Sequence, residues 1–351
     1  MSNRLTALLA NWFPEKDSYQ WVLASIIETQ RSSYRKTGAM MLINSQGQSY
    51  GLLSGGCLEA DLKRQAQKCW HNNTSITVCY DMQDDSDIAW QLGIGCGGLV
   101  KVLLQPINHD NNYLDLLTLK SQLDNRNACF YYIDTFNNQS ACASNNQVLL
   151  KAVSSLEPLV AIKPAPALVI FGGGIDAQPL VKIAHTLGWF ICLVDSRTAY
   201  ARPAYFKEAD LVINQDYDDV KQSLLLPKAD AVVIMHHNVS LDALALQLVK
   251  SQPRLASASY LGLLGPQHRT EQVLEKAQLL STDLPSKLAN PIGFDLGGEL
   301  PESIALAILS QAHAAIEQTS GESLGYFTSN ISPNVNISIA NPIKQVVNHA
   351  G

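Results

Sequence analysis

ALVIFGGGIDAQPL, at residues 167–180, decides how the second half of the chain folds. Its apolar start is typical of a buried strand, and a tight turn at Gly172, Gly173 and Gly174 leads into a helix. Gly172, Gly174 and Ala177 match the G-x-G-x-x-G/A spacing of Rossmann turns, which bind phosphate through exposed N–H groups and the helix dipole. The segment predicts a phosphate site for a nucleotide-like cofactor. A glycine turn that serves only helix–sheet packing is the alternative.

Strand and helix patterns alternate beyond this turn. Further strands are expected at FICLVD (190–195), LVINQ (211–215) and AVVIM (231–235), and a last helix is expected to open at Pro301. Such alternation favours a parallel sheet with crossover helices.

The first half instead shows short apolar strands and one helix that begins near Cys57. We therefore predict the α/β class: a C-terminal Rossmann-like parallel sheet domain after a smaller α+β N-terminal domain. The expected ranges are 1–163 for the N-terminal domain, 164–318 for the Rossmann-like domain and 319–351 for a poorly ordered tail.

Composition excludes several classes of protein. A net charge of −6 over 351 residues gives no basic face for nucleic acid. No apolar run approaches the roughly 20 residues that span a bilayer, and the N-terminus does not resemble a signal peptide, so we expect a cytoplasmic protein without stable membrane insertion. The 7 cysteines contain no C-x-x-C pair, so free thiols are expected rather than disulfides or a zinc site.

Asp195 ends the second expected strand, where a carboxylate meets a ribose hydroxyl in dinucleotide-binding folds. Arg197, next to it, is a candidate for a further phosphate contact, with a solvated arginine as the alternative.

Two cysteines lie among glycines. Cys57 follows Ser54, Gly55 and Gly56 at the expected start of a helix, a position that favours the thiolate. Cys96 lies in the run GIGCGG at 93–98. Together they suggest a site for a soft, thiolate-seeking ligand and are the two candidate metal contacts; inert, buried thiols are the alternative for each.

Two further segments carry polar candidates. His236 and His237 follow a strand whose carboxyl end is expected at the ligand-binding edge of the sheet, although loop histidines bonded to backbone are the alternative. Asp295 lies in the glycine-rich loop PIGFDLGGEL (291–300), which either closes over a ligand or forms only a turn.

The ordered series of motifs resembles the XdhC/CoxI family of xanthine dehydrogenase and carbon monoxide dehydrogenase accessory proteins, over residues 20–315. The segments that carry the resemblance are SSYRKTGAMM (32–41), SGGCLEADL (54–62), GIGCGGLVKVLLQP (93–106), FGGGIDAQPL (171–180), VDSR (194–197), VVIMHHNVSLDALAL (232–246), YLGLLG (260–265) and PIGFDLGGELPESIA (291–305).

The resemblance implies a chaperone that binds the molybdenum cofactor (molybdopterin) as cargo, supports its sulfuration and delivers it to a xanthine dehydrogenase-type apo-enzyme. It implies a cysteine desulfurase as a further partner. Cys57, Cys96 and His237 carry over as cofactor contacts, together with the glycine turn and Asp195. A dimer is expected from the small first domain and short linker.

Two other functions stay open at this point. The glycine motif also suits an NAD(P)-dependent oxidoreductase, in which His236 or His237 donates a proton and Asp195 holds the adenine ribose. An NAD(H)-binding redox sensor, in which a cysteine responds to oxidation, is the third hypothesis.

Overall fold

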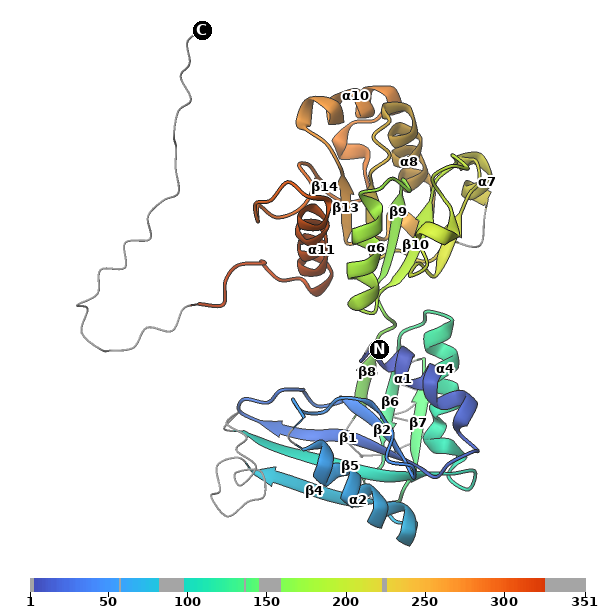
Figure 1. Cartoon of the computed structure of the whole chain (residues 1–351), viewed down its shortest axis with the longest axis vertical. Helices are drawn as coiled ribbons and strands as arrows, with labels where there is room; N and C mark the ends of the chain where they lie inside the picture. The colour runs from blue at the N-terminus through green and yellow to red at the C-terminus, as the bar shows by residue number, and fades with distance from the viewer. Residues whose placement is uncertain are drawn as a thin grey trace, which may run out of the picture.

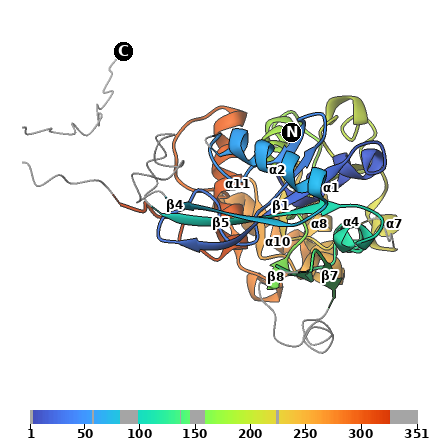
Figure 2. The ribbon, with the colours of Figure 1, turned by 90° about the horizontal axis from the view of Figure 1, so that it is seen from below.

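The computed structural model describes residues 3–56, 58–81, 98–135, 137–144, 159–222 and 226–325. These residues form two domains that follow each other along the long axis of the molecule (Figure 1). Seen from below, the N-terminal domain lies in front of the C-terminal one (Figure 2).

The N-terminal domain contains two antiparallel sheets. The larger has the order β3-β2-β1-β5-β4 and the smaller has the order β7-β6-β8. Their strands are β1 (Trp21–Gln30), β2 (Met40–Asn44), β3 (Ser49–Gly51), β4 (Ile76–Asp81), β5 (Leu99–Ile107), β6 (Cys129–Ile133), β7 (Ser140–Ala143) and β8 (Leu159–Ile162). The helices are α1 (Leu5–Trp12), α2 (Glu59–Asn72) and α4 (Leu116–Asp124), with short 3-10 turns at Phe13–Glu15 and Asn112–Asp115.

The larger sheet is buried on both faces, and alternate side chains of β1 pack on opposite faces. Trp21 and Leu23 pack with residues of α1 and α4, whereas Val22 and Ala24 pack with residues of α2 on the other face. Because successive side chains of a strand point to opposite faces, one apolar strand contributes to both cores.

The C-terminal domain is built on a six-stranded parallel sheet with the order β11-β10-β9-β12-β13-β14. Its strands are β9 (Ala167–Phe171), β10 (Phe190–Val194), β11 (Leu211–Ile213), β12 (Ala231–Ile234), β13 (Tyr260–Leu263) and β14 (Leu288–Ala289). Numbered within the domain, this order is 3-2-1-4-5-6, the arrangement of the Rossmann fold.

Helices cover both faces of the parallel sheet (Figure 1). They are α6 (Ala177–Thr186), α7 (Tyr217–Gln222), α8 (Val239–Ser251), α9 (Pro253–Ala256), α10 (Gln267–Ala277) and α11 (Pro301–Glu317), with 3-10 turns at Pro203–Tyr205 and Ser281–Asp283. Leu168 and Ile170 of β9 pack with α6 and α11, whereas Val169 and Phe171 pack with α7, α8 and α10. Burial on both faces explains why these strands are apolar throughout.

The α/β fold class is confirmed: a Rossmann-like parallel sheet domain follows a smaller domain with antiparallel sheets. Strand β7 lies in the polar stretch NNQSACAS (137–144), whose composition is typical of turns, and it pairs with β6. Of the tail predicted at 319–351, residues 326–351 lie outside the described residues. Across the described ranges, no helix has the length and apolar character needed to cross a bilayer.

The two domains meet at the amino ends of the parallel strands. Arg4 Nε donates to the carbonyl of Leu187, just before β10, at 3.2 Å. Arg126 Nη2 donates to the carbonyl of Ala165, just before β9, at 3.0 Å. The carboxyl ends of the strands therefore lie at the edge of the sheet that points away from the N-terminal domain (Figure 1).

Candidate functional site

The candidate site lies where the strand order reverses, between β9 and β12 at the carboxyl edge of the parallel sheet. β9 pairs with β10 on one side and with β12 on the other, and Phe171 is opposite Ile234 in the register. The loops after these strands therefore lead to helices on opposite faces of the sheet, α6 after β9 and α8 after β12. Open parallel sheets bind ligands at this switch point.

The glycine turn has a packed side and an open side. Gly172 has φ +115°, and a Cβ there would lie 2.7 Å from the backbone of Met235 and His236. A Cβ at Gly173 would lie 2.8 Å from the carbonyl oxygen of Tyr200, whereas at Gly174 it would meet nothing within 4 Å. Packing alone thus accounts for the first two glycines, and the third exposes backbone to open space.

Helix α6 begins directly after this open backbone. No side chain of the described residues caps its amino end. The first N–H groups of a helix have no partner inside the helix, and the dipole makes this end positive. Ala177 and Gln178 N–H already donate to the carbonyls of Gly174 and Ile175, so within the described residues the donors left for an anion are the N–H groups of Gly174, Ile175 and Asp176.

Asp195 is fully buried below the turn, and its carboxylate already has partners. Gly173 N–H donates to Oδ2 at 2.8 Å. Arg197 donates from its backbone N and Nε to Oδ1, at 3.0 and 2.9 Å, and from Nη2 to Oδ2 at 2.7 Å. Burial opposes ionisation of Asp195, but these hydrogen bonds outweigh it and hold the pKa below its ordinary value. Asp195, the residue predicted to meet a ribose, thus anchors the turn and Arg197.

Arg197 extends from this anchor to Tyr200. Its guanidinium lies 3.7 Å from the ring centroid of Tyr200, and its side chain is 27% exposed. The hydrogen bonds of Asp195 raise the pKa of Arg197. Arg197 is thus a permanently charged side chain that Asp195 holds in place beside the glycine turn.

His236 is the centre of a buried polar network. Its Nδ1 lies 2.8 Å from Asp242 Oδ1 and its Nε2 lies 2.5 Å from the hydroxyl of Tyr217. Asp242 also pairs with Arg269, which donates from Nη1 to the carbonyl of Leu264 at 2.9 Å. The network ties β12 to helices α7, α8 and α10, because each of these helices contributes one of its members.

The charge of Asp242 is stabilised inside this network. Its side chain is completely buried, and burial opposes ionisation, yet the hydrogen bonds from His236 and Arg269 hold its pKa below the ordinary value. Burial raises the pKa of the Tyr217 hydroxyl well above its ordinary value. Tyr217 therefore stays a neutral hydroxyl.

His237 has the opposite environment to His236. It lies at φ +57° with its side chain 57% exposed, and its Nε2 is 2.8 Å from Asp176 Oδ2 at the start of α6. This contact joins the loop after β12 to the start of α6, directly after the glycine turn. His237 is thus the histidine placed to touch a ligand, and His236 orients the loop from below.

The structure brings most of the predicted residues of this domain together. The glycine turn, Asp195, Arg197 and His237 all surround the switch point. Asp295 is exposed in the loop between β14 and α11, and no contact within the described ranges joins it to the others. Sequence reasoning missed Tyr217, Asp176 and Arg269 as site components, since nothing in their spacing marks them.

In the N-terminal domain, the glycines next to the two predicted cysteines both lie beside residues 32–34. Ser54 lies just before α2: its Oγ accepts from Leu58 N at 3.0 Å and donates to Glu59 Oε2 at 2.6 Å. A Cβ at Gly98 would lie 2.1 Å from the carbonyl oxygen of Ser32, and one at Gly55 would lie 3.9 Å from the ring of Tyr34. Cys57 and Cys96 themselves lie outside the described residues.

The thiols that the structure does describe include two that are deeply buried. Burial raises the pKa of Cys69 and of Cys192 to about 12, which keeps both protonated and unreactive. Within the described ranges, no group of three or more His, Cys, Asp or Glu side chains is arranged to hold a metal ion.

Known families match both domains. The XdhC Rossmann domain matches residues 168–312, and the XdhC and CoxI family matches residues 16–81.

Two similar proteins align with most of the chain. A protein from Bacillus subtilis that is named as a probable xanthine dehydrogenase subunit is 28% identical, over 84% of this chain and 93% of its own length. The molybdenum cofactor insertion chaperone PaoD from Escherichia coli is 22% identical, over 83% of this chain and 81% of its own length.

A solved structure extends the likeness to the fold of both domains. The crystal structure of a xanthine dehydrogenase from Bacillus halodurans superposes with a TM-score of 0.77 and 28% identity, over 92% of this chain and 98% of that one. The motifs, the order of the parallel sheet and these matches agree: the chain belongs to the XdhC and CoxI family.

Proposed function

We propose that this chain binds the molybdenum cofactor as cargo, supports its sulfuration and delivers it to a xanthine dehydrogenase-type molybdenum hydroxylase. One relative is named a molybdenum cofactor insertion chaperone and another is named a probable xanthine dehydrogenase subunit. The observation that carries the proposal is the open backbone at Gly174, at the uncapped amino end of α6 and beside Arg197.

The phosphate of the cargo is proposed to bind at the start of α6. Gly173 N–H donates to Asp195, and Ala177 and Gln178 N–H donate to backbone carbonyls. The donors left for a phosphate are therefore those of residues 174–176, beside the space that a side chain at Gly174 would occupy. Arg197 supplies charge on the β10 side and His237 supplies a polar group on the β12 side.

The same geometry weighs against a nicotinamide dinucleotide. In dinucleotide-binding Rossmann folds the acid at the end of the second strand accepts from the ribose hydroxyls. Here both oxygens of Asp195 accept hydrogen bonds within the protein, and its side chain has no exposed surface. A ribose would have to displace the one charge-assisted bond from Gly173 N–H or the two from the Arg197 guanidinium.

Sulfuration is assigned to the N-terminal domain. Cys57 and Cys96 are the proposed thiol contacts, with a cysteine desulfurase as the sulfur source. The neighbours Gly56 and Gly98 belong to the domain at the amino edge of the parallel sheet, whereas the glycine turn lies at the carboxyl edge. We therefore propose a homodimer, in which the cysteine motifs of one chain serve the turn of its partner.

Reconstitution tests the proposal. The purified chain is loaded with molybdenum cofactor and mixed with apo-hydroxylase, and the recovered activity is compared with that from free cofactor. In parallel, NAD(H) is titrated and followed by fluorescence. Faster or more complete activation without nicotinamide binding supports delivery; tight NAD(H) binding without activation would contradict it and favour the oxidoreductase or sensor.

A further inference from the structure

Two free thiols, Cys129 and Cys142, lie on neighbouring strands of the small sheet in the N-terminal domain. Cys129 opens β6, and Cys142 lies in β7, directly opposite Tyr131 in the antiparallel register. Because side chains alternate between the two faces of a strand, Cys129 shares a face with Tyr131 and therefore with Cys142. The two cysteines are thus diagonal neighbours, a spacing at which side chains of an antiparallel pair reach one another.

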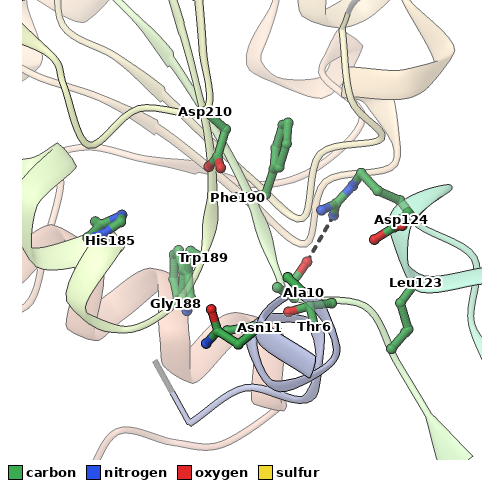
Figure 3. Close-up of a pocket in the computed structure, with 13 residues that line it drawn as sticks. Thr6, Ala10, Asn11, Leu123, Asp124, His185, Gly188, Trp189, Phe190 and Asp210 are labelled. Atoms are coloured by element: carbon green, nitrogen blue, oxygen red, sulfur yellow. Dashed lines mark hydrogen bonds between the residues drawn. The ribbon is translucent and has the colours of Figure 1, made fainter. Parts of the chain in front are cut away.

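The small sheet lies close to the joint between the two domains. β6 follows α4, whose residues Leu123 and Asp124 line the cavity between the domains (Figure 3). β8 pairs with β6 and leads into the linker before β9. The proposed cofactor site lies at the carboxyl edge of the parallel sheet, so the thiol pair belongs to a different part of the molecule.

A hydrogen bond joins the two sulfur atoms. The Cys142 thiol donates it to the Cys129 sulfur, which lowers the pKa of Cys129 and raises the pKa of Cys142. Burial opposes ionisation of both thiols, but at Cys129 the hydrogen bond outweighs it. Cys129 is therefore the member of the pair that ionises first, and its thiolate is the nucleophile.

The surroundings give a small oxidant access to the pair and leave the strands room to close on it. Cys129 is 2% exposed, whereas Cys142 is only partly buried and packs against the same apolar cluster. β7 is the edge strand of its sheet, and in the described part of the chain it pairs with β6 alone. It can therefore shift toward β6 by the short distance that separates two hydrogen-bonded thiols from a disulfide.

We propose that Cys129 and Cys142 form a reversibly oxidisable dithiol, a modification site that reacts with peroxide. The Cys129 thiolate takes one oxygen from hydrogen peroxide and becomes a sulfenic acid, while the O–O bond breaks and the released hydroxide takes up a proton. The Cys142 thiol then attacks this sulfur, the S–O bond breaks, and a second water leaves as the S–S bond forms. The two thiols together lose two hydrogens and two electrons, and one peroxide is reduced to two waters. A dithiol reductant reverses the reaction by thiol–disulfide exchange.

Peptide mapping of the full chain tests this, because residues 127–151 contain both cysteines and no internal Lys or Arg, so trypsin releases them as one peptide. The folded protein is treated with hydrogen peroxide, and its remaining thiols are then alkylated with N-ethylmaleimide in denaturant. We expect this peptide to become two hydrogens lighter and unalkylated, and to regain both alkyl groups after treatment with dithiothreitol. Cys192, a buried thiol with its pKa raised to about 12, lies alone in the tryptic peptide 183–197 and is the internal control. It should oxidise about tenfold or more slowly. A peptide 127–151 that stays doubly alkylated, or that reacts no faster than Cys192, overturns the proposal.

Two alanine variants separate the pair from a single thiol. Cys142→Ala removes both the hydrogen-bond donor and the second sulfur, so the lighter peptide should disappear and Cys129 should oxidise about tenfold or more slowly. Cys79→Ala removes an exposed thiol of β4 in the larger sheet and should leave oxidation of the peptide 127–151 unchanged. Equal oxidation rates in both variants contradict the assignment. Cys129→Ala, expected to leave Cys142 alkylated, replaces Cys142→Ala if near-UV circular dichroism shows that variant unfolded.

Discussion

Alanine substitutions at Gly172 and Gly174 separate the packing role of the glycine turn from its binding role. At Gly172 a Cβ would lie 2.7 Å from the backbone of Met235 and His236, at φ +115°. Left-handed backbone costs an L-residue about 1–2 kcal/mol and overpacking costs about 1–3 kcal/mol. We therefore expect Gly172→Ala to lower the free energy of unfolding by roughly 2–5 kcal/mol.

Gly174→Ala is the matched control for stability. The added methyl meets nothing within 4 Å, and the residue has no positive φ, so the free energy of unfolding should change by less than about 0.5 kcal/mol. The methyl would nevertheless occupy the space proposed for the phosphate. Affinity for the cofactor is expected to fall about tenfold or more, equivalent to about 1.4 kcal/mol.

Urea denaturation followed by circular dichroism measures the first effect, and equilibrium binding of molybdenum cofactor measures the second. Wild-type stability in Gly172→Ala would refute the close-packing argument. Wild-type affinity in a stable Gly174→Ala would refute the location of the phosphate.

Three further predictions address the buried network and the N-terminal domain. Asp242→Asn should destabilise the Rossmann domain by about 3–5 kcal/mol at neutral pH, because Arg269 and His236 lose a buried charge partner. The pKa of Asp242 is lowered in the folded state, so its contribution to stability is fully present above the unfolded pKa of about 3.9 and is lost as pH falls through the folded pKa. Urea denaturation from pH 7 to 3 should therefore show the difference in unfolding free energy between wild type and variant narrowing only below about pH 4. Gly98→Ala should lower the melting temperature, because its Cβ would lie 2.1 Å from the Ser32 carbonyl, and an unchanged melting temperature would count against that contact. Cys96→Ala should lower cofactor retention while circular dichroism stays native, and unchanged retention would remove this thiol from the proposed site.

Much of the Rossmann domain could be predicted from local sequence. The run Ala167–Phe171 followed by three glycines forms β9 and its turn as expected, and α11 begins at the predicted Pro301. These features depend on backbone properties of glycine and proline and on apolar runs, which are visible within a few residues. Strand β7 cannot be predicted from local sequence in the same way, because SACA has weak β-propensity and the pairing with β6 decides its structure.

The partners inside the site could not be predicted in the same way. His236 and His237 are adjacent, yet one is buried and the other is mostly exposed, because the chain turns to positive φ at His237. Arg269 reaches Asp242 from a helix that the sheet topology brings beside α8. Asp195 was expected to face a ribose, but the position of Arg197 two residues later lets that side chain fold back onto it. Such contacts depend on three-dimensional packing rather than on spacing in the sequence.

The most direct test of the central claim is the molybdenum and pterin content of the chain after co-expression with a molybdenum-cofactor pathway. Wild-type protein and Gly174→Ala are purified identically and analysed by metal quantification and by fluorescence of the oxidised pterin. We expect near-stoichiometric cofactor in the wild type and a large loss in the variant. Wild-type protein free of molybdenum and pterin, or a variant that retains both at the wild-type level, would contradict the claim.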